Sequence, residues 1–261
     1  MLRALIWDVD GTLAETELQG HRVAFNEAFA AAGLPWRWDE ALYRRLLRVA
    51  GGKERLLHYL RAERPPLPER WRDPATWEEL VRRLHRDKNA RYGRLVAAGR
   101  IPLRPGVRRL LEEARAAGLR QAVATTTSPE NVEALLRQAL GEAAEGLFET
   151  VVAGDAVPAK KPAPDAYLLA LERLGLPAKA CLALEDTPQG LAAARAAGLV
   201  TVVATEEPGP FPGAALVVGH LGDPGRPAPV REDPQGVLEA PGALVDLAAL
   251  RRLHRAALGH G

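Results

Sequence analysis

Apolar residues follow two different patterns along the 261-residue chain. Short continuous apolar runs lie at Leu5–Trp7, Ala122–Ala124, Val151–Ala153 and Cys181–Leu184. Such runs are typical of strands that are buried on both faces, as in a parallel sheet. Beyond Gly118, segments with helical periodicity separate the runs, so the pattern predicts an α/β fold with a doubly wound parallel sheet and right-handed crossovers.

The stretch between the first two strands is helical in character. Apolar residues recur there at helical spacing in four segments, 23–29, 42–47, 56–60 and 80–84. Glycine and proline clusters separate these segments and end the helices. We therefore predict a helical cap domain at residues 15–99, inserted into an α/β core made of residues 1–14 and 100–261. The linkers near 14–17 and 98–105 are the natural hinges for closure of such a cap.

Polar side chains of types that serve in catalysis or ligand binding follow the predicted strands. They are Asp8 and Asp10 after the first strand, Thr125, Thr126 and Thr127 after the second, Lys161 in a later loop, and Glu185 and Asp186 after the last apolar run. Ligands gather at the carboxyl ends of strands in this class of fold. Residues two apart on an extended chain point the same way, so Asp8 and Asp10 would share one side. Two such acids repel each other unless a cation neutralises them or they divide nucleophilic and proton-transfer duties.

Each of these features also has a simpler structural explanation. An Asp-x-Asp-Gly sequence is often only a turn, and Ser128-Pro129 suits the first turn of a helix. A lysine pair on a loop is usually solvated, and acids before a helix complement its dipole. Taken together, however, four carboxylates at two strand ends, with no His or Cys cluster, suit a hard octahedral ion such as Mg²⁺ better than zinc. The hydroxyls and free N–H groups of Thr125–Ser128 would form a cradle for an anion such as phosphate.

Composition narrows the classes of partner. Lys and Arg total 35 against 33 Asp and Glu, a net charge of +2 that gives no general argument for nucleic acid or an anionic membrane. No apolar stretch reaches the length of a membrane span, and the first strand begins too early to leave room for a targeting peptide, so we expect a cytoplasmic protein. Cys181 is the only cysteine and lies in an apolar run, which predicts a packed, inert thiol in a reducing compartment.

Four of these motifs carry a resemblance to a known family. They are Asp8-Val9-Asp10-Gly11-Thr12-Leu13, Thr125 after an apolar run, Lys161-Pro162, and Glu185-Asp186. In order and approximate spacing they match the four motifs of the haloacid-dehalogenase-like (HAD) hydrolase superfamily. The inserted helical segment resembles the C1-type cap of that superfamily.

Further segments resemble the CbbY branch of the superfamily. They are Ala14–Glu17, His21–Asn26, Leu46-Leu47 leading to Gly51–Arg55, and Ala124–Thr127. That branch is associated with the Calvin cycle. The activity that it implies is a xylulose 1,5-bisphosphate 1-phosphatase, which removes an inhibitor of ribulose bisphosphate carboxylase. The implied link to the carboxylase is functional, through this small-molecule substrate, and requires no direct contact.

The resemblance also implies roles in the core. Asp8 would be the nucleophile that forms an aspartyl-phosphate, and Asp10 would protonate the leaving alcohol and later activate water. Mg²⁺ would be held by the Asp8 carboxylate, the Asp10 carbonyl and Asp186, with Glu185 acting directly or through water. Thr125 and Lys161 would stabilise the equatorial oxygens of the transferring group.

Substrate choice is expected to reside in the cap. The segment Gly51, Gly52, Lys53 and Arg55 could offer backbone amides and two cations to a second phosphate, or could be an ordinary turn before a helix. Glu17 and His21 could bind sugar hydroxyls or orient Asp10, or could be a half-exposed pair of no special role. The arginines on the preceding helix, Arg44, Arg45 and Arg48, could add positive potential or only form a solvated face.

Alternatives to the bisphosphatase remain. A phosphosugar mutase would use the same core, and a non-catalytic sugar-phosphate sensor, or a binding protein associated with the carboxylase, would keep only the binding. A haloalkanoic dehalogenase is disfavoured, because its metal-free chemistry needs neither Asp10 nor the acidic pair.

Two features depart from the family pattern. Compared with the phosphosugar-mutase branch, the chain has one extra residue between the Asp-Gly-Thr turn and His21, so the hinge role of that branch's histidine is not transferred. The C-terminal region is less similar to the family. Glu206–Gly213 and Gly219–Pro241 are rich in Gly and Pro and predict an exposed loop, followed by a helix at Leu244–Leu258 that packs on the core.

Overall fold

A computed structural model describes residues 1–49, 51–238 and 242–259. The chain divides into two compact units. A core unit comprises Met1–Ala14, Leu103–Thr126 and Leu140–Gly261, and a cap unit comprises Glu15–Pro102 and Thr127–Ala139. The cap unit thus includes a segment, residues 127–139, that lies outside the insertion expected from the sequence. That the insertion at 15–99 is an independent domain stays a prediction.

The core unit is built on a seven-stranded sheet with the order β3-β2-β1-β4-β5-β6-β7. The strands are β1 Ala4–Trp7, β2 Arg120–Ala124, β3 Thr150–Val152, β4 Cys181–Glu185, β5 Val200–Ala204, β6 Leu216–Val218 and β7 Val230–Glu232. All pairs are parallel except β6 with β7. The order changes direction between β1 and β4, and ligands bind at such a switch point in open α/β sheets. The predicted doubly wound fold is confirmed.

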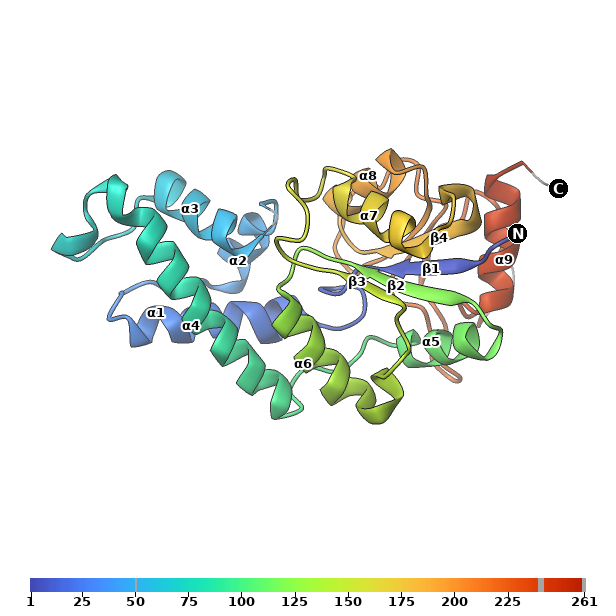
Figure 1. Cartoon of the computed structure of the whole chain (residues 1–261), viewed down its shortest axis with the longest axis horizontal. Coiled ribbons are helices and arrows are strands. Elements are labelled where there is room, and N and C mark those ends of the chain that lie inside the picture. The colour runs from blue at the N-terminus through green and yellow to red at the C-terminus, as the bar shows by residue number, and fades with distance from the viewer. Residues whose placement is uncertain (50, 239–241, 260–261) are drawn as a thin grey trace. The chain divides into compact units, whose positions relative to one another are not determined.

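Helices cover both faces of this sheet (Figure 1). The helices α7 Asp165–Leu174 and α8 Pro188–Ala196 pack on one face, where alanines and small apolar residues of β1, β2 and β4 meet them. The helix α5 Val107–Ala116 lies against β2 from the other side, and its Leu111 carbonyl accepts a hydrogen bond from the Gln121 side chain. Cys181 is fully buried in this core, so the prediction of a packed thiol is confirmed, and burial raises its pKa to about 11.

The cap unit contains the helices α1 Arg22–Ala31, α2 Glu40–Leu46, α3 Gly52–Glu63 and α4 Trp77–Ala97, together with most of α6 Pro129–Leu140. The predicted helical segments of the insertion are confirmed. A single aromatic cluster holds α1 to α3 together: the ring of Trp38 lies 4.7 Å from Phe25, 4.9 Å from Phe29 and 5.2 Å from Tyr59, measured between ring centroids. Aromatic pairs at such distances contribute beyond their buried area.

The C-terminal region is more ordered than the sequence suggests. The prediction of an exposed loop at 219–241 is wrong in part, because β7 pairs with β6, and Leu221 and Ala228 are 2% and 8% exposed. Residues 239–241 of that loop lie outside the described residues. The helix α9 Leu247–Ala257 confirms the predicted terminal helix. A short strand without clear periodicity is specified by its pairing partners rather than by its own sequence.

Candidate active site

The first two candidate acids follow a strand that lies in the middle of the sheet. The Asp8 N–H donates to the Leu184 carbonyl at 3.0 Å, so the ladder between β1 and β4 continues to the nucleophile position. The register pairs Trp7 with Leu184, which places Asp8 beside Glu185. Asp8 is 6% exposed and Glu185 is fully buried. Two acids that are 177 positions apart in the sequence are therefore fixed side by side by backbone hydrogen bonds.

Lys161 bridges this pair of acids. Its ammonium donates to Asp8 Oδ1 at 2.6 Å, to Glu185 Oε1 at 2.6 Å and to the Ala124 carbonyl at 2.9 Å. Three donors on one compact cation are thus used on three different strand ends. The Tyr167 hydroxyl also donates to Glu185 Oε1, and the Asp186 N–H donates to Glu185 Oε2 at 3.2 Å. Glu185 accordingly orients its neighbours.

The electrostatic consequence is a site with too many negative charges for one lysine. Burial raises the pKa of the Asp8 carboxyl to about 8; Lys161 acts in the opposite sense, while Glu185 and Asp10 add to the rise. Burial works against the charge of Lys161, but the two carboxylates raise the pKa of its ammonium above the ordinary value. Buried carboxylates in this arrangement favour a further positive ligand.

The residues fit a divalent cation. Asp8, Glu185 and Asp186 each offer a carboxylate oxygen, and these atoms all lie within 4.8 Å of one another. Asp186 is half-buried, and Thr12 Oγ1 donates to its Oδ1 at 3.4 Å. Gly11 lies so close to Asp186 that a Cβ at that position would collide with the carboxylate, and Gly190 lies equally close to Glu185. Carboxylate oxygens gathered this closely suit a hard cation such as Mg²⁺.

The remaining candidates of the core motifs follow β1 and β2 along the chain. Thr125 follows β2, is 3% exposed, and donates its N–H to the Val152 carbonyl at 2.9 Å. Asp10 is half-buried in the turn after β1, and Thr126 is half-buried after Thr125. Thr127 belongs to the cap unit, where its Oγ1 accepts a weak hydrogen bond of 3.4 Å from Asn131.

The cap candidates form their own polar network. The Tyr43 hydroxyl donates to Glu17 Oε2 at 2.6 Å and accepts from Arg55 at 2.9 Å, and the Arg55 guanidinium lies 3.6 Å from the same Glu17 oxygen. Arg55 is buried, whereas the Glu17 side chain is 22% exposed. Arg55 thus serves as a buried partner of Glu17. Of the three residues Glu17, Tyr43 and Arg55, Glu17 is the one that reaches solvent.

The other cap candidates lie at three places. Gly51 precedes α3 as its N-cap, and Gly52 and Lys53 form the first turn, with Lys53 half-buried. A helix start of this kind presents backbone N–H groups and favours anions. His21 is 4% exposed and its ring stacks on Tyr92 at 4.1 Å. Arg44 pairs with Glu40 and Arg45 with Glu63, while Arg48 is exposed.

Three residues of these networks escaped the sequence analysis. Tyr167, Tyr43 and Thr12 each give a hydroxyl to a candidate acid. Tyr167 and Tyr43 lie on the apolar faces of helices, where periodicity marks a residue as core and says nothing of its hydroxyl. Thr12 could have been found, because it stands inside the first motif.

The fold and the acid-rich strand ends define a hydrolase of the HAD type, and the comparisons agree: the chain belongs to the haloacid dehalogenase-like hydrolase family, whose model matches residues 2–198. It is 50% identical over 260 residues to the protein CbbY, plasmid, of Cupriavidus necator, with 98% of both chains covered. The expectation of an enzyme that acts on phosphate esters is confirmed by this membership.

Solved structures place the chain in the same branch. It is similar to CbbY from Rhodobacter sphaeroides in complex with phosphate, with a TM-score of 0.77 and 45% identity over 84% of this chain and 95% of that chain. A mutant of that protein in complex with xylulose 1,5-bisphosphate matches equally well. None of the helices within the described residues has the length and apolar content needed to cross a membrane.

Proposed function

We propose that this protein is a Mg²⁺-dependent sugar-bisphosphate phosphatase that removes the 1-phosphate of xylulose 1,5-bisphosphate. The observation that carries the proposal is the buried network of Asp8, Lys161 and Glu185 beside Asp186. It combines a carboxylate nucleophile, a fixed cation and a set of oxygen ligands at the sheet's switch point. The substrate is suggested by the CbbY mutant that binds this bisphosphate.

The chain's own residues account for the reaction in two displacements. An Asp8 oxygen attacks phosphorus and the bond from phosphorus to the sugar oxygen breaks, while Asp10 gives its proton to the leaving alkoxide. Asp10 then removes a proton from water, whose oxygen attacks phosphorus and releases Asp8 and inorganic phosphate. Lys161 and Thr125 stabilise the charge on the equatorial oxygens in both steps.

The metal would be held by Asp8, the Asp10 carbonyl and Asp186. When bound, it offsets the repulsion between the Asp8 carboxylate and the phosphate. Glu185 fits better as an indirect partner, because both its oxygens already accept hydrogen bonds from Lys161, Tyr167 and the Asp186 N–H.

The cap residues select the substrate in this proposal. The first turn of α3, with Gly51, Gly52 and Lys53, binds the phosphate that is not cleaved, and Glu17, held by Tyr43 and Arg55, binds sugar hydroxyls. Removal of xylulose 1,5-bisphosphate in the cytoplasm would protect ribulose bisphosphate carboxylase from inhibition without any contact between the two proteins.

The proposal is tested by phosphate release from xylulose 1,5-bisphosphate, ribulose 1,5-bisphosphate, glucose 1-phosphate and a small aryl phosphate. We expect a strong preference for the xylulose compound, lost when a chelator removes Mg²⁺ and restored by excess Mg²⁺. Weak release from all four would reject this substrate. An isomerised sugar phosphate without free phosphate would establish a mutase, and tight binding without turnover would establish a sensor.

A further inference from the structure

The segment Leu103-Arg104, which returns the chain to the core unit, is hydrogen-bonded to the end of the turn that carries Asp10. Leu103 pairs with Ala14 in an isolated antiparallel bridge, and the Arg104 N–H donates to the Leu13 carbonyl at 2.9 Å. The backbone of Leu103-Arg104 therefore runs alongside the end of the first motif. This places the Arg104 side chain beneath the Asp10–Thr12 turn, although the residue lies 94 positions after Asp10.

The Arg104 guanidinium joins three separate segments. It is 5% exposed, and it donates to the carbonyls of Gly11 and Ala204 and, at 2.7 Å, to that of Gly219. Gly11 belongs to the first motif, whereas Ala204 ends β5 and Gly219 follows β6. Arginine suits this task because its planar fork presents several donors in fixed directions.

The Gly11 carbonyl is a sensitive point at which to hold the turn. It belongs to the peptide plane between Gly11 and Thr12, directly after the proposed acid Asp10. Gly11 lies against the Asp186 carboxylate, and the Thr12 hydroxyl donates to that same carboxylate. Fixing this peptide thus fixes the spacing between Asp10 on one strand end and Asp186 on the next.

The other two acceptors belong to a region with no assigned role. The family model ends at residue 198, so Ala204 and Gly219 lie beyond it. The region is firmly attached near Arg104: the Leu221 N–H donates to the Pro105 carbonyl at 3.2 Å, and the Gly106 N–H donates to Asp223 at 2.8 Å. Displacement of either strand end would move the carbonyls that orient the guanidinium.

We propose that Arg104 is a positioning residue, through which the C-terminal region beyond residue 198 holds the Asp10–Thr12 turn in its reactive geometry. Arg104 touches neither substrate nor metal in this proposal and acts through the Gly11 peptide. Its effect on turnover rests on the function proposed above, whereas its effect on the order of the turn does not.

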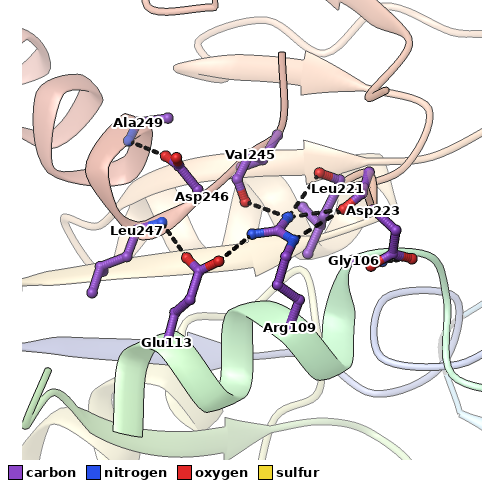
Figure 2. A network of polar contacts seen from close by, with 10 residues as sticks. Gly106, Arg109, Glu113, Leu221, Asp223, Val245, Asp246, Leu247 and Ala249 are labelled. Carbon is purple, nitrogen blue, oxygen red and sulfur yellow. Dashed lines mark hydrogen bonds and ion pairs between the residues drawn. The ribbon is translucent and has the colours of Figure 1, made fainter. Parts of the chain in front are cut away.

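A second arginine provides a matched control. Arg109 on α5 also attaches the C-terminal region: it donates to the carbonyls of Gly222 at 2.8 Å and Val245 at 3.2 Å and pairs with Glu113 at 2.7 Å (Figure 2). These partners lie on α5 and in the C-terminal region. Loss of Arg109 therefore weakens the same attachment without removing a donor to the Asp10–Thr12 turn.

The experiment compares Arg104→Met, Arg104→Lys and Arg109→Met with the parent chain, at a temperature well below the unfolding midpoint of each. Both methionine variants should unfold at lower temperature. Only Arg104→Met should lower kcat, by about 10- to 100-fold with KM changed much less, because small misplacements of reacting groups are costly. Arg104→Lys should recover part of the loss. Arg109→Met should keep kcat within about twofold of the parent, because the partners of Arg109 lie on α5 and in the C-terminal region.

Two readouts are independent of turnover. In metal-free protein, hydrogen–deuterium exchange of the peptide spanning residues 9–14 should rise in Arg104→Met and stay unchanged in Arg109→Met. Mg²⁺ binding to the substrate-free protein, followed by calorimetry, should weaken only in the Arg104 variants. Equal losses of kcat in Arg104→Met and Arg109→Met, or unchanged exchange at 9–14 in Arg104→Met, would overturn the proposal.

The same data separate this inference from the function on which it rests. If the parent chain releases no phosphate from any substrate, the phosphatase proposal fails, while exchange and Mg²⁺ binding still decide the role of Arg104. If Arg104→Met does not fold, the exchange of residues 9–14 is measured in Arg104→Lys, whose compact ammonium lacks the planar fork of the guanidinium. Faster exchange than in the parent, in a folded lysine variant, supports positioning. Exchange equal to that of the parent refutes it.

Discussion

The candidate residues of the core unit and those of the cap unit are held in different ways. In the core, Asp8 and Glu185 lie at the ends of neighbouring strands and Lys161 lies in a loop; all three are almost fully buried, and the Lys161 ammonium bonds both acids. In the cap, Glu17 and Arg55 project from helical segments and are joined through one hydroxyl, that of Tyr43, beside an aromatic cluster. The two core acids are fixed by backbone ladders, whereas the cap set depends on side-chain packing. Replacements in the core should therefore disturb chemistry and folding together, and replacements in the cap should change substrate preference.

The largest effect is expected at the nucleophile. Asp8→Asn keeps the shape of the side chain but removes the attacking oxygen anion, so kcat should fall by about four orders of magnitude or more. Binding of xylulose 1,5-bisphosphate, measured by calorimetry, should persist. Glu172→Gln, the same chemical change at an exposed position of α7, is the control and should leave kcat unchanged. Substantial phosphate release by purified Asp8→Asn would remove Asp8 from the nucleophile role.

Loss of the central cation should affect both stability and activity. Lys161→Met leaves two buried carboxylates without their ammonium partner, which should cost about 3–5 kcal/mol of unfolding free energy and about 10²- to 10³-fold in kcat. Added Mg²⁺ should recover part of the stability, because a ligand that binds only the folded state stabilises it.

The neighbouring lysine supplies the control for that variant. Lys160 lies 3.2 Å from Asp155, whose side chain is 68% exposed. When both lysine variants are compared with the parent by urea titration, Lys160→Met should therefore cost less than about 1 kcal/mol of unfolding free energy. A similar loss of unfolding free energy in the two lysine variants would show that the buried network of Asp8, Lys161 and Glu185 does not stabilise the fold as proposed.

The first turn of α3 should discriminate between bisphosphates and monophosphates. Lys53→Ala removes a cation from the proposed site of the second phosphate and should raise KM for xylulose 1,5-bisphosphate about tenfold or more, the range of one charged hydrogen bond. Kinetics with a small aryl phosphate should change little. Arg61→Ala, at the exposed end of the same helix, should alter neither substrate. An equal rise in KM for both substrates would contradict the distal-phosphate role of Lys53.

The smallest effect is expected in the Glu17 network. Tyr43→Phe keeps the ring but removes the hydroxyl between Glu17 and Arg55, which should cost about 1 kcal/mol of stability and raise KM for the sugar substrate severalfold with kcat nearly unchanged. Tyr59→Phe alters a hydroxyl in the same aromatic cluster and should leave KM at its parent value. A fall in kcat alone in Tyr43→Phe would mean that this network serves the chemical step and not substrate binding.

The sequence predicted the elements whose local pattern is strong. The apolar runs at β1, β2 and β4, the cap helices and the terminal helix were all expected near their observed bounds. The strands β5, β6 and β7 were not assigned. The apolar run of β5 resembles those of the assigned strands and could have been found, whereas the three-residue strands β6 and β7 form only through their neighbours. The roles of the site residues remain proposals, although the structure places Asp8, Lys161, Glu185 and Asp186 together as the motifs required.

The sequence by itself determined the chemical groups and their order: an acidic turn after the first strand, a lysine in a loop, and an acidic pair after the fourth strand. Those features depend on local spacing, which a chain carries before it folds. Only the tertiary structure decided which groups form hydrogen bonds with one another, because Tyr167, Tyr43 and Arg104 reach their partners across long sequence separations. Such contacts arise from sheet register and helix packing, and no local pattern encodes the direction in which a buried hydroxyl or guanidinium donates.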